Sequence, residues 1–144
     1  MQLAFYKGPA STFGQRLFHR LVCMVTGGRY SHVELVIDGV CHSASSRDGG
    51  VRSKVVDFSS GRWDLVDLPA YLVSVSADDA RAWFAAHNGQ PYDTPGLLGF
   101  LLPWRVERPS AYFCSEAVMA ALGYAEPWQY SPADMDNIFS VSAA

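Results

Sequence analysis

The dipeptide Asp38-Gly39, set between two strand-like runs, constrains the fold of this chain more than any other feature. His32–Ile37 precedes it and Val40–Ser45 follows it. Asp-Gly between two such runs is the strongest short-range signal for a β-hairpin with a two-residue turn. The sequence therefore predicts two antiparallel strands that pair directly with each other.

Further strands and helices are predicted around this hairpin. Strand-like runs cover residues 3–6, 54–58 and 63–68, and residues 45–50 form a polar, glycine-rich loop. Helices are predicted over residues 13–25, after the N-cap Ser76, after Phe113, and from Pro132 to Ile138 with Ser131 as N-cap. The 144 residues, of which 49% are hydrophobic, fit one domain over residues 1–144. The predicted class is α+β, an antiparallel sheet packed with helices.

The first predicted helix carries a stripe of apolar side chains at intervals of three and four. They are Phe13, Leu17, Phe18, Leu21, Val22 and Val25, and Gly27-Gly28 follows as a stop. This spacing is typical of an amphipathic helix. Cys23 lies on the same helix and is interpreted as a small buried hydrophobic residue, as is Cys41.

Composition argues against several classes of function. The formal net charge of −3 provides no basic surface for nucleic acid. The longest apolar stretches, 21–25 and 97–104, are far shorter than the roughly 20 residues of a membrane-spanning helix. The N-terminus has no recognisable secretory signal, which predicts a cytoplasmic protein unless it is exported by another route or carried in a virion. Three cysteines without paired spacing predict neither disulfides nor structural zinc.

A cysteine at the predicted start of a helix is the strongest functional feature. Cys114 follows Tyr112 and Phe113 and precedes a run of good helix formers, 117–122, which Gly123 ends. A thiol in the first helical turn lies close to unpaired backbone N–H groups and to the positive end of the helix dipole. Both favour the thiolate, which is the nucleophilic form of the sulfur. Cys114 is therefore the predicted nucleophile.

The predicted base is His32, at the start of the strand His32–Ile37. Because side chains alternate along a strand, His32, Glu34 and Val36 share one face, and the opposite face is entirely apolar. The apolar face is expected to pack in the core, so His32 and Glu34 should face solvent or a cleft. A cysteine with an imidazole base indicates a cysteine hydrolase or acyltransferase.

Three residues are candidates for the third group, which accepts a hydrogen bond from the other imidazole nitrogen of His32. Glu34 has the best chemistry, but two residues along one strand separate its Cβ from that of His32 by ~6–7 Å. His42 and Ser43 lie on the neighbouring strand and point to opposite sides, so one of them shares the face of His32. A metal site of His32, Glu34 and His42 is a weaker alternative, since no His-Glu-x-x-His motif is present.

Four segments occur in an order that resembles a known family. They are Tyr30-Ser31-His32-Val33-Glu34-Leu35, Ser43-Ala44 through Gly50-Val51, Gly89-Gln90-Pro91-Tyr92-Asp93, and Phe113-Cys114-Ser115-Glu116. The chain resembles the circularly permuted branch of the NlpC-type papain-like superfamily, and within it the small YiiX-like proteins, some of which phages encode. Each motif is weak alone, and four in this order are more specific.

The resemblance implies a permuted papain-like fold in which the histidine precedes the cysteine and faces it from a central strand. It implies Cys114 as nucleophile and His32 as base, and it aligns the family's third polar residue with Ser43. Relatives often have glutamate or histidine there, so an uncharged serine is a departure. Glu34 or His42 would then substitute for it, or catalysis would be slow, or the chain would have a non-enzymatic role.

The leading hypothesis is a thiol hydrolase that uses Cys114 and His32 on a peptide amide, with cell-wall peptide as the expected substrate. The substrates of the resembled family are amide or ester bonds, including those of cell-wall peptides and lipids. No cofactor, metal or nucleic acid is expected. The alternative is a structural or assembly component of a phage tail tip, with virion or tail proteins as partners and weak or no catalysis.

Overall fold

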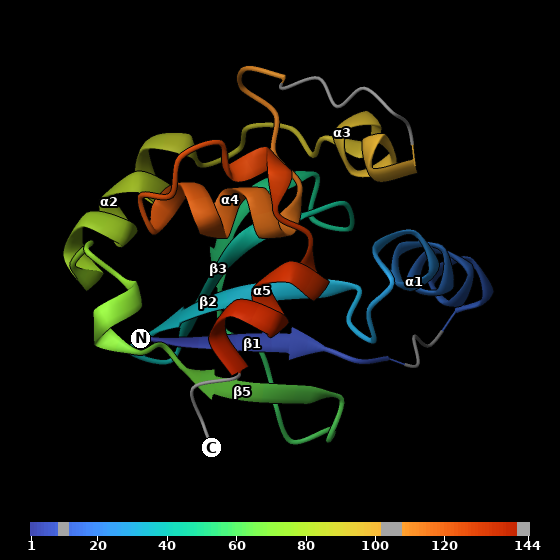
Figure 1. Cartoon of the computed structure of the whole chain (residues 1–144), viewed down its shortest axis with the longest axis horizontal. Helices are drawn as coiled ribbons and strands as arrows, with labels where there is room; N and C mark the ends of the chain where they lie inside the picture. Colours follow the sequence, from blue (N-terminus) through green and yellow to red (C-terminus); the bar gives the residue numbers. More distant parts are fainter. Residues whose placement is uncertain (9–11, 102–107, 141–144) are drawn as a thin grey trace.

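The predicted hairpin lies inside a five-stranded antiparallel sheet. In the computed structural model, which describes residues 1–8, 12–101 and 108–140, β2 (His32–Ile37) and β3 (Val40–Ser45) are joined by Asp38-Gly39, and both turn residues have a positive φ. The other strands are β1 (Gln2–Tyr6), β4 (Gly50–Lys54) and β5 (Trp63–Asp67). The order across the sheet is β4-β3-β2-β1-β5, and all neighbours are antiparallel (Figure 1). The prediction of an α+β domain with an antiparallel sheet is confirmed.

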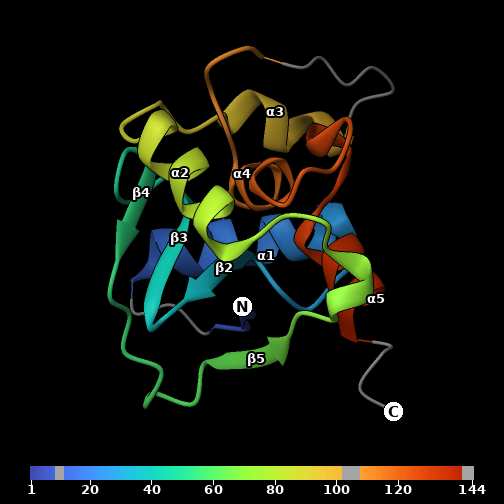
Figure 2. The ribbon, with the colours of Figure 1, turned by 90° about the vertical axis from the view of Figure 1, so that its left-hand side faces the viewer.

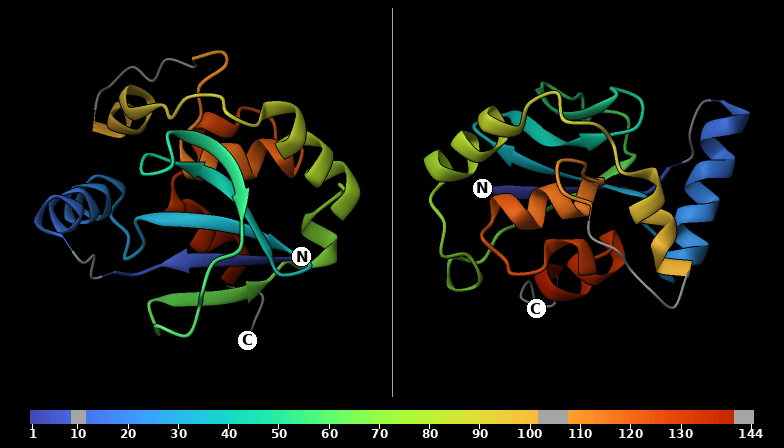
Figure 3. Two further views of the ribbon diagram at one scale, coloured as in Figure 1. Left: turned by 180° about the vertical axis from the view of Figure 1, so that it is seen from behind. Right: turned by 90° about the horizontal axis from the view of Figure 1, so that it is seen from above.

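Helices cover one face of this sheet and flank one end of it. α2 (Ala77–His87), α4 (Cys114–Ala121) and α5 (Pro132–Ser140) lie on the covered face, and Figure 2 shows α4 end-on between the other two. α1 (Phe13–Thr26) and the short α3 (Thr94–Leu98) lie beside the end of the sheet at which β2 begins (Figure 3). Single turns of 3-10 helix occur at Ala70–Leu72, Gly99–Leu101 and Pro127–Gln129. Within the described ranges, none of the helices combines the length and the apolar character needed to cross a bilayer.

The core fills the space between the sheet and the three covering helices. The predicted apolar face of β2 supplies Val33, Leu35 and Ile37, which pack against Ala117 and Val118 of α4. The predicted boundaries of α4 are confirmed, because Cys114 is its first residue and Gly123 follows it with φ +79°. The apolar stretch 97–104 forms the end of α3 and a 3-10 turn as far as residue 101, and residues 102–104 lie outside the described ranges.

The strand predicted over residues 54–58 is wrong. β4 ends at Lys54, and the chain that follows crosses the face of the sheet opposite α4 on its way to β5 (Figure 3). Val56 and Phe58 pack there in a cluster with Val36 and Cys41. The alternating apolar residues in this segment therefore reflect packing onto the sheet and not pairing with a neighbouring strand.

The apolar stripe of α1 is only partly covered. The helix begins after the N-cap Thr12 and ends at Gly27, as predicted. Val22 is buried in a cluster with Leu97 and Phe113. The rest of the stripe differs from the expectation, since Phe13 and Leu17 are 82% and 59% exposed. The cause is position, because α1 lies at the end of the sheet and not on its covered face.

The segment 89–93 connects the sheet to the start of α4. Backbone hydrogen bonds join it to Val51 of β4 at one end and to Tyr112, just before α4, at the other. Gly50 permits the first contact, because its φ is +149° and a Cβ there would lie 1.9 Å from the carbonyl oxygen of Gln90. Three stretches that are far apart in the sequence therefore meet at one place in the fold.

Gly50→Ala is expected to lower the free energy of unfolding by ~3 kcal/mol, because the new Cβ meets backbone atoms and φ is positive. Gly49→Ala is the matched control, since Gly49 also has a positive φ, +82°, but open space around the position of a Cβ. The control should cost ~1 kcal/mol. Urea denaturation followed by circular dichroism measures both, and equal costs would contradict the close approach of segment 89–93 to Gly50.

Candidate active site

The neighbouring strands β2 and β3 diverge where β2 begins. The β2–β3 ladder ends at the pair Leu35–His42, whereas the pairing of β3 with β4 continues as far as Ser45. A side chain bridges the opening, since the Ser43 hydroxyl donates a hydrogen bond of 2.7 Å to the carbonyl oxygen of Val33. The divergence leaves the backbone groups of the first residues of β2 without ladder partners on β3.

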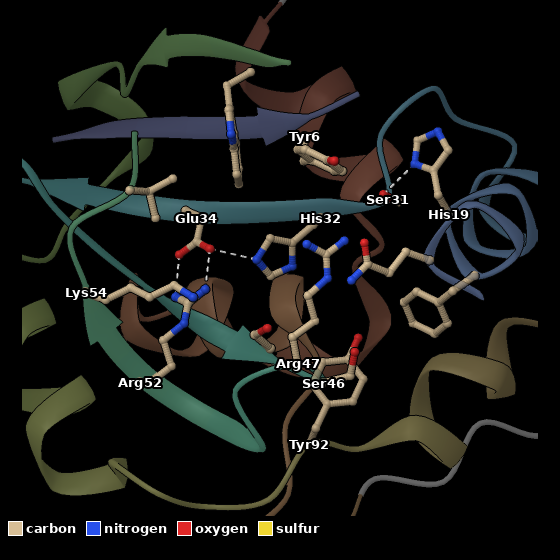
Figure 4. A pocket seen from close by; sticks show the side chains of 15 residues that line it. Tyr6, His19, Ser31, His32, Glu34, Ser46, Arg47, Arg52, Lys54 and Tyr92 are labelled. Carbon is tan, nitrogen blue, oxygen red and sulfur yellow. Dashed lines mark hydrogen bonds and ion pairs between the residues drawn. The ribbon is translucent and has the colours of Figure 1, made fainter. Parts of the chain in front are cut away.

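A pocket of about 210 Å³ opens at the same end of the sheet (Figure 4). Aromatic side chains, Tyr6, Trp63 and Tyr92, form part of its wall. His32 and Glu34, the two polar side chains of β2 that the sequence predicted to share a face, also line it. Of the two predicted surroundings, solvent or a cleft, this face of β2 has the cleft.

Cys114 is the first residue of α4 and is not itself one of the residues that line the pocket. The N–H of the N-cap Phe113 donates to the Glu116 carboxylate at 3.2 Å, which supports the start of the helix at this residue. Cys114 is only 1% exposed, but it interacts with two residues that line the pocket, His32 and Tyr92. Burial raises the pKa of Tyr92, and the charge of Cys114 raises it further. Tyr92 therefore both lines the pocket and contacts the sulfur.

His32 connects the sulfur to a carboxylate. Its Nε2 lies 2.7 Å from Glu34 Oε1, so Nδ1 is the ring nitrogen that remains to share a proton with Cys114. Burial lowers the pKa of His32, but the charge of Glu34 and the hydrogen bonding with Cys114 and Glu34 outweigh it and raise the pKa to about 9. The protonated imidazolium is therefore the favoured form at neutral pH.

Glu34 is fixed in turn by the guanidinium of Arg52. The two groups form a bidentate pair with both N···O distances at 2.5 Å, and Glu34 is 1% exposed. Burial raises the pKa of Glu34, but the hydrogen bonds from Arg52 and the charge of His32 lower it to about 2. Arg52 Nε also donates to Asp48 at 2.8 Å. Glu34 is therefore ionised at neutral pH and accepts a hydrogen bond from the His32 ring.

Arg52 is the functional residue that the sequence analysis missed. It lies on β4, and its guanidinium reaches Glu34 of β2 by passing over β3 at Ser43, its partner in the strand register. A glutamate or histidine at position 43 would occupy the space that the guanidinium crosses. The sequence signal was the alternation of Arg52 and Lys54, but the strand was predicted to begin only at Lys54.

His42 and Ser43 do not contact the His32 ring. The hydrogen bonds that Ser43 donates go to backbone carbonyls. His42 Nδ1 lies 2.7 Å from Ser53 Oγ, and its ring packs on Phe84 on the helix-covered face, opposite that of His32. The three donors of the predicted metal alternative thus do not converge. In the part of the chain that the structure describes, no three His, Cys, Asp or Glu side chains are grouped so that they could hold a metal ion.

The two other cysteines lie in different surroundings. Cys41 is buried, as predicted, and lies on the sheet face opposite α4. Burial raises its pKa to about 11. Cys23 is half-buried and not fully buried as predicted, with its sulfur 3.7 Å from His19 Nε2. Burial also raises the pKa of Cys23. Neither thiol has the imidazole–carboxylate pair that His32 and Glu34 form.

Together the site residues form a line of four groups, the Cys114 thiol, the His32 imidazole, the Glu34 carboxylate and the Arg52 guanidinium. In comparisons with known proteins, no family model and no curated protein matches this chain. Inference about function therefore depends on the chemistry of these groups. A sulfur beside an imidazolium, with a carboxylate behind it, is suited to nucleophilic attack and proton transfer.

Stability in acid is expected to depend on Glu34. Its pKa of about 2 lies below the ordinary value of 4.5. The ionised carboxylate therefore stabilises the fold above pH 4.5, and this stabilisation is lost as the pH falls toward 2. Glu34→Gln is expected to lower the free energy of unfolding at pH 7 by ~3 kcal/mol, because Arg52 loses its buried partner. It should also flatten the decline of stability in acid.

Thermal unfolding from pH 2 to 7 measures this effect. Asp38→Asn is the control, since Asp38 is an exposed carboxylate that pairs with Arg81 at the surface, and its change should stay below ~0.5 kcal/mol. A parallel loss of stability in the wild type and in Glu34→Gln, as the pH falls from 4.5, would contradict the role of the buried carboxylate.

Proposed function

We propose that this protein is a thiol hydrolase that cleaves an amide or ester by acyl transfer through Cys114, with a permuted papain-like fold. The observation that carries the proposal is the interaction of His32 with both Cys114 and Glu34. This imidazole joins a sulfur at a helix start to an ionised carboxylate. Such an arrangement generates a nucleophile and stores the proton that the leaving group will need.

In the first half of the reaction, the sulfur of Cys114 attacks the carbonyl carbon of the substrate. His32 takes up the thiol proton as the sulfur attacks. The first backbone N–H groups of α4 have no partner within the helix and are available to stabilise the developing oxyanion. The bond from carbon to the leaving group then breaks, and His32 donates its proton to the departing nitrogen or oxygen.

In the second half, water resolves the thioester. The neutral imidazole of His32 takes a proton from the attacking water, and the sulfur leaves as the acid product forms. Glu34 keeps Nε2 protonated throughout, so that Nδ1 alone exchanges protons with Cys114 and with water. The bidentate pair with Arg52 holds Glu34 in a fixed orientation and makes it the third group of the site.

The order of the site residues supports the permuted papain-like resemblance. His32 comes before Cys114 in the chain and lies on a central strand, and Cys114 begins the helix that packs on that strand. The other motif segments also lie around the site, since 89–93 bonds to β4 at Gly50-Val51 and its Tyr92 interacts with Cys114. The four motifs therefore all contribute residues to the site or to the contacts around it.

The alternative of a non-catalytic tail-tip component was supported in part by the uncharged Ser43 in the third position. Glu34 supplies the negative charge that Ser43 lacks, and Ser43 leaves the space through which Arg52 reaches Glu34. Both observations favour the enzyme as our proposal. The substrate class that we retain is a peptide or lipid-like amide or ester.

Selective alkylation tests the activated nucleophile. Iodoacetamide at pH 6 is expected to label Cys114 on the order of ten times faster than Cys23 or Cys41, whose raised pKa values keep them as thiols. His32→Gln should slow the labelling of Cys114 ~100-fold. Peptide mapping by mass spectrometry measures each site.

His87→Gln is the control for this experiment, because His87 lies on α2 outside the pocket and should leave the rate unchanged. Equal and slow labelling of all three cysteines, with no effect of His32→Gln, would remove the activated thiol and the proposed function.

A further inference from the structure

The pocket gathers positive charge in a protein whose formal net charge is negative. Three cationic side chains line it, Arg47, Arg52 and Lys54, whereas Glu34 is the one carboxylate among the lining residues that the structure describes. The charge of Glu34 is already engaged by Arg52 and His32. The space next to the nucleophile is therefore electropositive, even though the chain carries a net charge of −3.

The three cations differ in what already binds them. Arg52 pairs with Glu34 and Asp48, and Lys54 lies 2.5 Å from the same Asp48 carboxylate. Arg47 is exposed in the turn between β3 and β4, and no described residue forms a hydrogen bond or ion pair with its side chain. Of these three, Arg47 alone has its charge available to a ligand.

The Arg47 side chain points into the pocket. Figure 4 draws it among the side chains that line the pocket, on the same side of the sheet as His32. A guanidinium presents a planar fork of N–H donors that matches the oxygens of a carboxylate or phosphate. The concave walls concentrate the field of this charge, and the protonated His32 adds to it.

We propose that Arg47 is a specificity-determining residue that binds an anionic group, a carboxylate or a phosphate, on the substrate next to the scissile carbonyl. The inference rests on the proposed function, because it takes Cys114 as the nucleophile. It restricts the substrate class to acyl compounds that carry a carboxylate or phosphate group close to the reacting carbon. Neutral amides and esters of the same size are then poorer substrates.

The test uses two alkylating agents that differ by one group. Iodoacetate and iodoacetamide both react by forming a bond from sulfur to carbon while iodide leaves, but iodoacetate carries a carboxylate where iodoacetamide carries a neutral amide. In the wild-type protein, the ratio of the iodoacetate rate to the iodoacetamide rate is expected to be higher at Cys114 than for an ordinary thiol. Arg47→Gln should slow iodoacetate on the order of tenfold and change iodoacetamide less than about twofold.

Two further variants define the effect. Arg47→Lys keeps the charge but not the planar fork, so its rate with iodoacetate should lie between those of wild type and Arg47→Gln. Arg62→Gln is the matched control, since Arg62 does not line the pocket, and it should leave both rates unchanged. Circular dichroism of Arg47→Gln should match wild type, because no described residue bonds to the Arg47 side chain.

Protection experiments distinguish the two kinds of anion. Glutarate and glycerol 3-phosphate are each added as competitors of the iodoacetamide reaction at Cys114. Protection by either one, lost in Arg47→Gln, supports the proposal, and the better protector identifies carboxylate or phosphate as the preferred group.

If Arg47→Gln slows the reactions with both reagents equally, or slows neither, the anion site is overturned while the proposed function stays intact. The absence of protection by both competitors would overturn it as well. Failure of Cys114 to react selectively with either reagent would overturn the proposed function itself and this inference with it.

Discussion

The buried carboxylate of Glu34 is the group on which the rest of the site depends. Burial alone would favour its neutral form, and an ionised carboxylate without partners in such a place would cost several kcal/mol. Arg52 and His32 offset that cost from two sides. The same pair of contacts connects β4 to β2 across β3 and fixes the orientation of the imidazole. Stability and chemistry are therefore coupled through one side chain.

The divergence of β2 from β3 makes this arrangement possible. The β2–β3 ladder ends at Leu35–His42, so His32 and Glu34 lie on a part of β2 that is not paired with β3. Ser43 compensates for part of the lost pairing with its bond to Val33, and its small size leaves a path for Arg52. Ser43 is thus part of a consistent set with Glu34 and Arg52. Ser43 carries no charge, and the charged groups at this place come from Glu34 and Arg52.

Much of this architecture could be predicted from local sequence. The hairpin followed from Asp38-Gly39, and the start of α4 from the helix formers after Cys114. The shared face of His32 and Glu34 followed from alternation in β2. Each of these features depends on residues close together in the chain, so spacing and turn chemistry were sufficient.

The features that could not be predicted depend on distant contacts. The pairing of Arg52 with Glu34 requires the register of three strands, which no local pattern specifies. The segment after Lys54 has strand-like alternation, but the sheet offers it a face to pack on and no edge to pair with. The exposure of Phe13 and Leu17 follows from where α1 lies relative to the sheet. In each case the tertiary position decided what the local pattern left open.

Titration of the His32 imidazole by NMR tests the central claim most directly. With ¹⁵N-labelled histidine, we expect His32 to remain protonated up to about pH 9 in the wild-type protein. Both Glu34→Gln and Cys114→Ala should move its titration to lower pH, because the interactions with Glu34 and with Cys114 both raise the pKa of His32. Titration of His32 near the ordinary value of 6.5, unchanged in both variants, would contradict the line of groups from Cys114 through His32 to Glu34.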